Sequence, residues 1–388
     1  MNRIYLDNAS TTFPKPREVP EAMYRYMTEM GSNIGRGCYS NAYSVEEKVY
    51  ETRELLCDFF HGPDGRNVVF TKNITESLNI VLKGFLHRGD HVIVSSMEHN
   101  AVMRPLVQLE KQGVSFTRIP CREDGTLPLE KLSEAFQKNT KAVVMTHASN
   151  VCGTLLPIEE VGKLCAEHKV KFIADCAQTA GVWPIDMEKM KIDVLCFTGH
   201  KGLLGPQGIG GFILRNEMVK ELEPLLSGGT GSFSHTELVP ELMPDRFEAG
   251  TMNLPGILGL GAALKWHKTI GQGEIREHEL ALTKLFLEGI KSRDPQEKYI
   301  KAVGKKDISG RTGVVSVQIL KKELAQAAFE LDDTYGIMTR VGLHCAPSAH
   351  KTLGTFPTGT IRFAFGWWNT KEETERAVEA LWKIAKEG

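Results

Sequence analysis

Lys201 ends a Thr-Gly-His-Lys segment, residues 198–201, that lies between two short apolar runs. The runs cover residues 194–197 and 212–214, and a glycine-rich loop separates the lysine from the second of them. A lysine held at the end of a buried strand can form a Schiff base with a carbonyl compound. Taken alone, each of the 47 lysines and arginines is more often a solvated surface charge. Lys201 therefore becomes a candidate only through the residues that accompany it.

Asp175 is the first of these residues, because it directly follows another apolar run, residues 171–174. A carboxylate at a buried strand end is costly unless a cation pairs with it. The protonated pyridine nitrogen of pyridoxal 5'-phosphate (PLP) would be such a partner, and a carboxylate in that position tunes the electronics of the cofactor. A strand-end aspartate and a strand-end lysine together predict a PLP site.

Polar residues follow three further runs, at the edge where open α/β sheets bind their ligands. Thr75 lies at the start of a helical pattern after residues 68–70. A threonine there is most often a helix cap, but the free N–H groups of a helix N-terminus also hold phosphate. His99, after residues 91–94, is either a structural histidine or a plate that stacks on a planar cofactor. Asn150 has the corresponding place after the next run.

Six short apolar runs alternate with helical patterns in the part of the chain before about residue 265. The runs are residues 68–70, 91–94, 142–145, 171–174, 194–197 and 212–214. Continuous apolar strands separated by helices are typical of a mainly parallel sheet that is covered on both faces. Helices are also expected over residues 18–30 and 44–61. This part predicts an α/β domain. The glycine run before residue 212 leads into a strand rather than a helix, which argues against a dinucleotide loop.

The pattern changes after about residue 265, where charged helical stretches and alternating strands predict a smaller α+β domain. Helices are expected over residues 274–291 and 322–335, strands over 314–319 and 361–365, and a last helix to the end of the chain. Thr370 and Glu373 have the spacing of a capping box at the start of that helix. We therefore expect a large domain over residues 18–265 and a small domain made of residues 1–17 and 266–388.

The composition is that of an ordinary globular protein, with 41% hydrophobic and 24% charged residues in a chain of 388. A net charge of −1 gives no indication of a nucleic-acid or membrane-surface partner. Since no apolar run approaches the roughly 18 residues of a membrane span, we expect a cytoplasmic protein. The eight cysteines show no C-x-x-C pair or zinc-like spacing, so no metal site is expected.

Motifs along almost the whole chain, from about residue 4 to 385, share their order with a known family. They read YLDNAST, TKNITESLNIV, MEHNAV, ASNVCGTLLP, ADCAQTAG, FTGHKGLLGPQGIGG, RFEAGTMNLPGILGLGAAL, GLHCAPSAH and TIRFAF. In this order they resemble the class V, fold type I PLP enzymes, and within them the cysteine desulfurases. The resemblance implies a PLP-dependent enzyme with a fold type I architecture.

The resemblance also implies roles around the cofactor ring. Lys201 matches the Schiff-base lysine, and Asp175 matches the partner of the pyridine nitrogen. Gln178 matches the donor to the ring hydroxyl. His99 is similar to the residue that stacks on the ring and shuttles protons.

The phosphate contacts implied by the resemblance are Thr75, Thr198 and His200. Thr251 matches a residue that reaches the phosphate from the other subunit, which implies a homodimer. Asn150 would lie near ring and substrate.

For the substrate, Arg362 matches the arginine that binds the carboxylate, a task suited to a guanidinium group. Cys345 matches the nucleophile that takes sulfur from L-cysteine as a persulfide and leaves L-alanine. Cys345 lies in a Gly-Leu-His-Cys-Ala-Pro loop whose sequence has no obvious packing pattern. A protein that accepts the sulfur is a possible further partner.

One loop departs from the family, which often reads His-Arg-Gly-x-His where this chain has Gly-Arg-Gly-Cys-Tyr at residues 35–39. Arg36 remains, either as a solvated charge or as an anion contact toward the substrate. Three alternatives stay open at this point: a selenocysteine lyase, another class V reaction such as transamination or epimerisation, and a non-catalytic PLP-binding scaffold.

Overall fold

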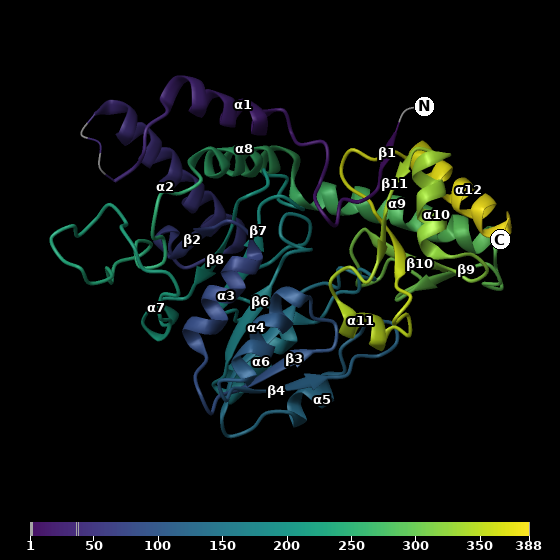
Figure 1. Ribbon diagram of the computed structural model, residues 1–388, viewed down its shortest axis with the longest axis horizontal. Helices are drawn as coiled ribbons and strands as arrows, with labels where there is room; N and C mark the ends of the chain where they lie inside the picture. The colour runs from purple at the N-terminus through teal and green to yellow at the C-terminus, as the bar shows by residue number, and fades with distance from the viewer. Residues whose placement is uncertain (1–2, 36, 38, 388) are drawn as a thin grey trace.

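The apolar runs of the first part of the chain form one seven-stranded sheet in the computed structural model, which describes residues 3–35, 37 and 39–387 (Figure 1). In spatial order its strands are β2 (Val68–Thr71), β8 (Gly210–Leu214), β7 (Val194–Thr198), β6 (Lys171–Asp175), β5 (Thr140–Thr146), β3 (His91–Ser95) and β4 (Ser115–Ile119). Neighbours from β7 to β4 pair in parallel, and β8 is antiparallel to both β2 and β7. The predicted α/β fold with a mainly parallel sheet is confirmed.

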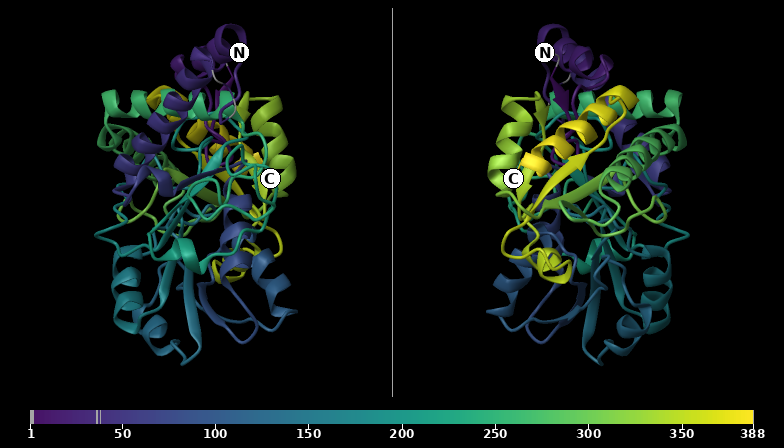
Figure 2. Two further views of the ribbon diagram at one scale, coloured as in Figure 1. Left: turned by 90° about the vertical axis from the view of Figure 1, so that its left-hand side faces the viewer. Right: turned by 90° about the vertical axis from the view of Figure 1, so that its right-hand side faces the viewer.

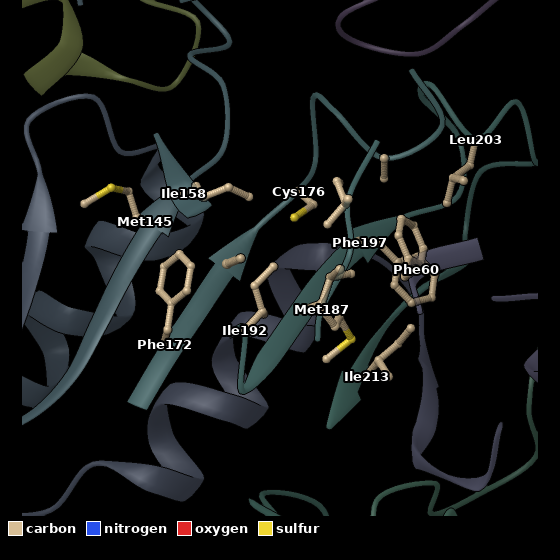
Figure 3. Close-up of a cluster of buried hydrophobic side chains, with 14 of the residues drawn as sticks. Phe60, Met145, Ile158, Phe172, Cys176, Met187, Ile192, Phe197, Leu203 and Ile213 are labelled. Atoms are coloured by element: carbon tan, nitrogen blue, oxygen red, sulfur yellow. The ribbon is translucent and has the colours of Figure 1, made fainter. Parts of the chain in front are cut away.

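Alternate residues of these strands enter two separate hydrophobic cores, one on each face of the sheet. In β7, for example, Leu195 and Phe197 belong to one core, and Val194 and Cys196 belong to the other. Figure 3 shows part of the first core, where Phe172 and Phe197 lie among other buried apolar side chains. Both faces are apolar, which is why the strands read as continuous hydrophobic runs.

Helices supply the other half of each core and cover both faces of the sheet (Figure 2). The first core is covered by α2 (Ser40–Phe60), α5 (Leu129–Glu134), α6 (Ile158–His168) and α8 (Leu254–Ile270). The second is covered by α3 (Ile74–Phe85), α4 (Asn100–Glu110) and α7 (Met218–Glu221). Outside these helices, α1 (Glu18–Arg25) packs on α8, and the 3-10 turn η2 (Gly65–Asn67) precedes β2.

A second group of elements, on the right in Figure 1, forms its own core. An antiparallel sheet has the order β12 (Arg340–Gly342), β13 (Thr360–Ala364), β10 (Val314–Ile319) and β9 (Ile300–Val303). Beside it, β1 (Ile4–Tyr5) pairs in parallel with β11 (Ile337–Met338). The helices of this group are α9 (Gln272–Arg293), α10 (Leu324–Asp333) and α12 (Lys371–Glu387), whereas α11 (Pro347–Thr352) packs against the first core of the large sheet. Ile4 and Leu6 share the core of these elements. The domain boundary at residues 265 and 266 stays a prediction, and it falls inside α8.

The ends of several helices differ from the expected ranges in ways that the structure explains. The helix expected over residues 18–30 is α-helical only to Arg25 and continues as a π-helical turn, η1 (Tyr26–Met30). At α12 the predicted capping box is confirmed: Thr370 Oγ1 accepts from the Glu373 N–H, and the Glu373 carboxylate accepts from the Thr370 N–H, each at 3.2 Å. The N-cap of α3 is Asn73, not the threonine at position 75.

Sequence patterns missed strands β4, β9, β11 and β12, which are short or lie at a sheet edge. β4 is the edge strand of the large sheet, and only its last residue, Ile119, is buried. No helix among the described residues combines the length and the apolar character needed to cross a bilayer.

Candidate active site

A cavity of about 200 Å³ lies at the carboxyl ends of the parallel strands, where the large sheet meets residues of the smaller one. Nearly all of the predicted site residues line it. They are Thr75, His99, Asn150, Asp175, Gln178, Thr198, His200, Lys201, Cys345 and Arg362. The large sheet supplies the first eight, from the last residues of its strands or from the segments that follow β2, β3, β5, β6 and β7, as expected for an open α/β sheet.

Lys201 lines the cavity in the loop that follows β7. Burial, followed by the charge of Arg362, lowers the pKa of Lys201 to about 8. The charge of Asp175 acts in the opposite direction. A lysine with a lowered pKa carries a larger share of free amine near neutral pH, which is the form that attacks a carbonyl carbon.

Asp175 is the last residue of β6, with 2% of its surface exposed. Its Oδ1 accepts a hydrogen bond from the Ala177 N–H at 3.0 Å. Burial raises the pKa of Asp175, while that hydrogen bond and the charge of Lys201 act to lower it. A buried carboxylate that borders a cavity is stabilised by a cation in that cavity. Gln178 follows in the same loop, and its side-chain amide donates to the Ala9 carbonyl at 3.1 Å.

The end of the cavity near Thr75, Thr198 and His200 has unused hydrogen-bonding atoms. Thr75 is the second residue of α3, so this end lies beside free N–H groups at a helix N-terminus. Thr198 Oγ1 and His200 Nδ1 are buried and have no partner in the described part of the chain. Buried polar atoms normally find a partner, so this end is suited to an anionic group with several acceptor oxygens.

His99 is the N-cap of α4, and its Nδ1 accepts a hydrogen bond from the Ala101 N–H at 3.0 Å. The neutral ring therefore carries its hydrogen on Nε2. Burial, followed by the charges of Lys201 and Arg340, lowers the pKa of His99 to about 4. The adjacent Glu98 is buried and accepts from the Thr146 N–H, which ties the loop after β3 to the end of β5.

Arg362 reaches the cavity because side chains alternate along β13. Its neighbours Ile361 and Phe363 enter the hydrophobic core of the smaller sheet, so Arg362 projects from the opposite face. One of its Nη atoms contacts Asp7 Oδ1 at 2.9 Å, and the other donates to the Asn150 carbonyl at 3.0 Å. Its buried Nε has no partner among the described residues.

Arg340 is a cavity residue that the sequence patterns did not indicate. It lies on β12 as the register partner of Arg362. Its Nη1 donates to Ser10 Oγ at 2.9 Å, and Arg362 donates to the same oxygen at 2.8 Å. Asp7 and Ser10 belong to the motif YLDNAST. This motif was the only feature of the sequence that indicated the surroundings of Arg340.

Cys345 lies in a turn between β12 and α11, and it is exposed at the cavity. His344 and Cys345 have φ values of 46° and 57°, in the left-handed region that non-glycine residues rarely adopt. The turn is held from the large sheet: the Asn100 N–H donates to the Cys345 carbonyl at 2.8 Å, and Asn150 Nδ2 donates to the His344 carbonyl at 2.7 Å. The thiol is therefore presented on a well-anchored backbone.

The family model described as "Aminotransferase class-V" matches residues 4–377 of this chain. The chain belongs to the aminotransferase class-V family. A probable cysteine desulfurase of Methanothermobacter thermautotrophicus is 35% identical over 391 residues, which cover all of this chain and 96% of that protein. A probable cysteine desulfurase of Pyrococcus abyssi is 34% identical over 390 residues, which cover 99% and 94% of the two chains.

Among solved structures, this class-V chain is similar to an apo cysteine desulfurase of Thermococcus onnurineus NA1. The TM-score is 0.92 at 32% identity, and the match covers 100% of this chain and 95% of that one. The fold type I architecture expected from the motifs is therefore confirmed.

Two further predicted residues of the class-V site are not among the described residues that line the cavity. Arg36 lies outside the described residues. Thr251 borders two neighbouring pockets instead, one of them lined also by α2 residues and by residues 229–231. A residue that reaches the phosphate of a second subunit would not line the cavity of its own chain.

The class-V cavity fits PLP on three separate points. The unpaired atoms of Thr198 and His200 suit a phosphate group. The buried carboxylate of Asp175 suits a protonated ring nitrogen. Lys201 supplies an amine with a lowered pKa for the aldehyde. All of these residues line the same cavity.

Proposed function

We propose that this chain is a PLP-dependent cysteine desulfurase, which converts L-cysteine to L-alanine and takes up the sulfur on Cys345 as a persulfide. One observation carries the proposal: the thiol-bearing Cys345 lines the same cavity as Lys201, Asp175 and Arg362. The full-length similarity to proteins named cysteine desulfurase supports it. A cavity with the lysine and aspartate alone would serve many class-V reactions equally well.

When bound, PLP supplies an electron sink that acidifies the substrate Cα–H bond. Lys201 would hold the cofactor, with Asp175 at the ring nitrogen and Gln178 at the ring hydroxyl. His99 would stack on the ring. Thr75, Thr198 and His200 would bind the phosphate, which accounts for the unpaired Thr198 Oγ1 and His200 Nδ1.

Arg362 would bind the substrate carboxylate, and Asn150 would lie beside the ring and the substrate. The Arg362 Nε has no partner in the described chain, so a donor remains for the substrate. The Lys201 amine would take the Cα proton, since its pKa of about 8 suits proton transfer near neutral pH.

Cys345 acts as a thiolate that attacks the substrate Sγ. A sulfur–sulfur bond forms, and the substrate Cβ–Sγ bond breaks. The electron pair of that bond stays on the carbon skeleton, which takes up a proton and leaves as alanine. The transferred sulfur remains on Cys345 as a persulfide, at an exposed position from which a sulfur-acceptor protein can remove it.

We infer a homodimer in which Thr251 reaches the phosphate of the partner subunit. Two large apolar side chains that line the pockets bordered by Thr251, Tyr50 and Leu226, are about half exposed, as expected for a surface that a second copy covers. The cytoplasmic location remains a prediction, and so does the role of Arg36 toward the substrate.

Product analysis tests the proposal. PLP-loaded protein is incubated separately with L-cysteine, L-selenocysteine and a panel of other amino acids, and alanine, sulfide, selenide and keto acids are measured. A desulfurase forms alanine and, with a reductant, sulfide from L-cysteine. Alanine from L-selenocysteine alone would identify a selenocysteine lyase, and keto acid without sulfide would identify an aminotransferase.

A further inference from the structure

The backbone of the Lys201 loop is held by an N-terminal segment, residues 7–15, that comes from the other end of the site. The carbonyl of His200 accepts hydrogen bonds from the Thr12 N–H at 3.1 Å and from Lys15 Nζ at 2.7 Å. Lys15 Nζ also donates to Thr12 Oγ1 at 2.7 Å, and that hydroxyl donates to the Lys201 carbonyl at 3.0 Å. Lys15 therefore contacts the residue before Lys201 directly and Lys201 itself through Thr12.

The same segment contacts three other parts of the site. Ala9 accepts from Gln178, and Ser10 accepts from both Arg340 and Arg362. Asp7 pairs with Arg362. A displacement of this segment would therefore affect the cofactor lysine and the substrate-binding arginine together.

The environment of Lys15 is unusual for a lysine. Its side chain is partly buried, and no carboxylate pairs with it among the described residues. His200, whose carbonyl it contacts, is itself affected by the charge of Lys15. Of the acidic groups in this region, Asp7 on its own segment is paired with Arg362, and the buried Glu279 lines a small pocket together with Thr12 and Lys201. In the described part of the chain, the ammonium donates to two neutral oxygens, the His200 carbonyl and Thr12 Oγ1.

We propose that Lys15 is a positioning residue, whose ammonium group holds the loop of His200 and Lys201 in the geometry that binds the cofactor phosphate and the cofactor aldehyde. The inference rests on the proposed PLP-dependent function. An ammonium donor makes a charge-assisted hydrogen bond, which is stronger than one between neutral groups. Without Lys15, the His200 carbonyl would lose the shortest of the hydrogen bonds that it accepts.

Burial lowers the pKa of Lys15 to about 7. Lys15 is charged below that pH and loses its charge as the pH rises through it. The part of the PLP affinity that Lys15 contributes should therefore fall as the pH rises through 7, whereas the free-amine form of Lys201, with its pKa of about 8, becomes more abundant over the same range.

The test compares Lys15→Met, Lys15→Arg and the control Lys163→Met, which removes an exposed lysine of α6 that pairs with Glu159. PLP dissociation constants are measured by absorbance titration of the apoproteins between pH 6 and 9, and kcat and KM for L-cysteine are measured on saturated enzyme. Melting temperatures of the apoproteins establish that each variant is folded.

Lys15→Met should weaken PLP binding about tenfold or more at pH 6.5, since hydrogen bonds from charged donors have that size of effect. The ratio of its dissociation constant to that of wild type should shrink as the pH rises through 7, because wild-type Lys15 then loses its charge. Lys15→Arg should restore affinity and keep it at higher pH, because guanidinium stays charged. Lys163→Met should behave as wild type.

Two results distinguish the ways in which this account can fail. If folded Lys15→Met binds PLP as tightly as wild type across the pH range, the positioning role is wrong although the desulfurase proposal stands. If wild-type protein binds no PLP, the proposed function itself is wrong.

Discussion

Arg340 and Arg362 face each other on neighbouring antiparallel strands, and both donate to the same oxygen, Ser10 Oγ. Like charges directly opposite each other in a sheet repel. Only one carboxylate, that of Asp7, pairs with this group in the described chain. The cluster therefore keeps an excess positive charge beside the cavity, which is suited to the carboxylate of an amino-acid substrate.

Replacing Arg362 tests this role. Arg362→Ala should raise KM for L-cysteine roughly 10- to 100-fold, as expected for a lost charged hydrogen bond. PLP binding should change little. Arg362→Lys keeps the charge but not the fork of donors, so it should recover only part of the loss. A KM unchanged in folded Arg362→Ala would show that the carboxylate binds elsewhere.

Cofactor attachment gives a second prediction. Borohydride reduction of the PLP-loaded protein, followed by peptide mapping, should place the pyridoxyl group on Lys201. Lys201→Ala should remove the label and the visible absorbance while leaving the fold intact. A label on Lys72 or Lys83 instead would contradict the assignment of Lys201.

Strands with continuous apolar sequences were predictable because both of their faces are buried, and the residues at their ends were predictable because parallel strands end at one edge. Asp175 and Lys201 were therefore found from local patterns. Arg340 and Lys15 were not. Each acts through contacts with residues far away in the sequence, and β12, which carries Arg340, has only three residues and is not fully buried. Spacing within one segment carries no information about such contacts.

The inferred dimer predicts complementation between two inactive variants. Thr251→Asp would place a negative charge beside the phosphate of the partner subunit and weaken binding there. Mixed with Lys201→Ala under conditions that exchange subunits, it should restore about a quarter of wild-type activity, because half of the dimers are hybrids with one intact site. No recovery in hybrids shown to have formed would mean that Thr251 serves its own chain.

The buried Glu279 of α9 predicts a pH dependence of stability. Burial raises its pKa to about 8, from an ordinary value of 4.5. The folded state binds this proton more tightly than the unfolded state, so the stabilisation is complete below pH 4.5 and is lost as the pH rises through 8. Glu279→Gln should not show this loss.

The melting temperatures of wild-type and Glu279→Gln apoprotein should therefore diverge between pH 5 and 9. At the alkaline end, the free energy of unfolding of the variant should exceed that of wild type by a few kcal/mol. Glu288→Gln, at an exposed position of the same helix, is the control and should follow wild type. Parallel curves for wild type and Glu279→Gln would place the pKa of Glu279 near its ordinary value.

The role of Cys345 is the central claim, because it separates desulfuration from the other reactions of the class-V family. Cofactor binding needs Lys201 and Asp175, whereas sulfur abstraction also needs a thiolate. Cys345→Ser should therefore bind PLP as wild type does. Selenium leaves more easily than sulfur, so turnover of L-selenocysteine should suffer far less than that of L-cysteine.

The most direct measurement is the rate of alanine formation from L-cysteine by PLP-loaded wild type and Cys345→Ser, with L-selenocysteine as the parallel substrate. We predict a loss of at least about 100-fold on L-cysteine. An equal loss on both substrates would make Cys345 an obligate nucleophile for each. An undiminished rate on L-cysteine in Cys345→Ser would contradict the account and make Cys345 a residue without a chemical role.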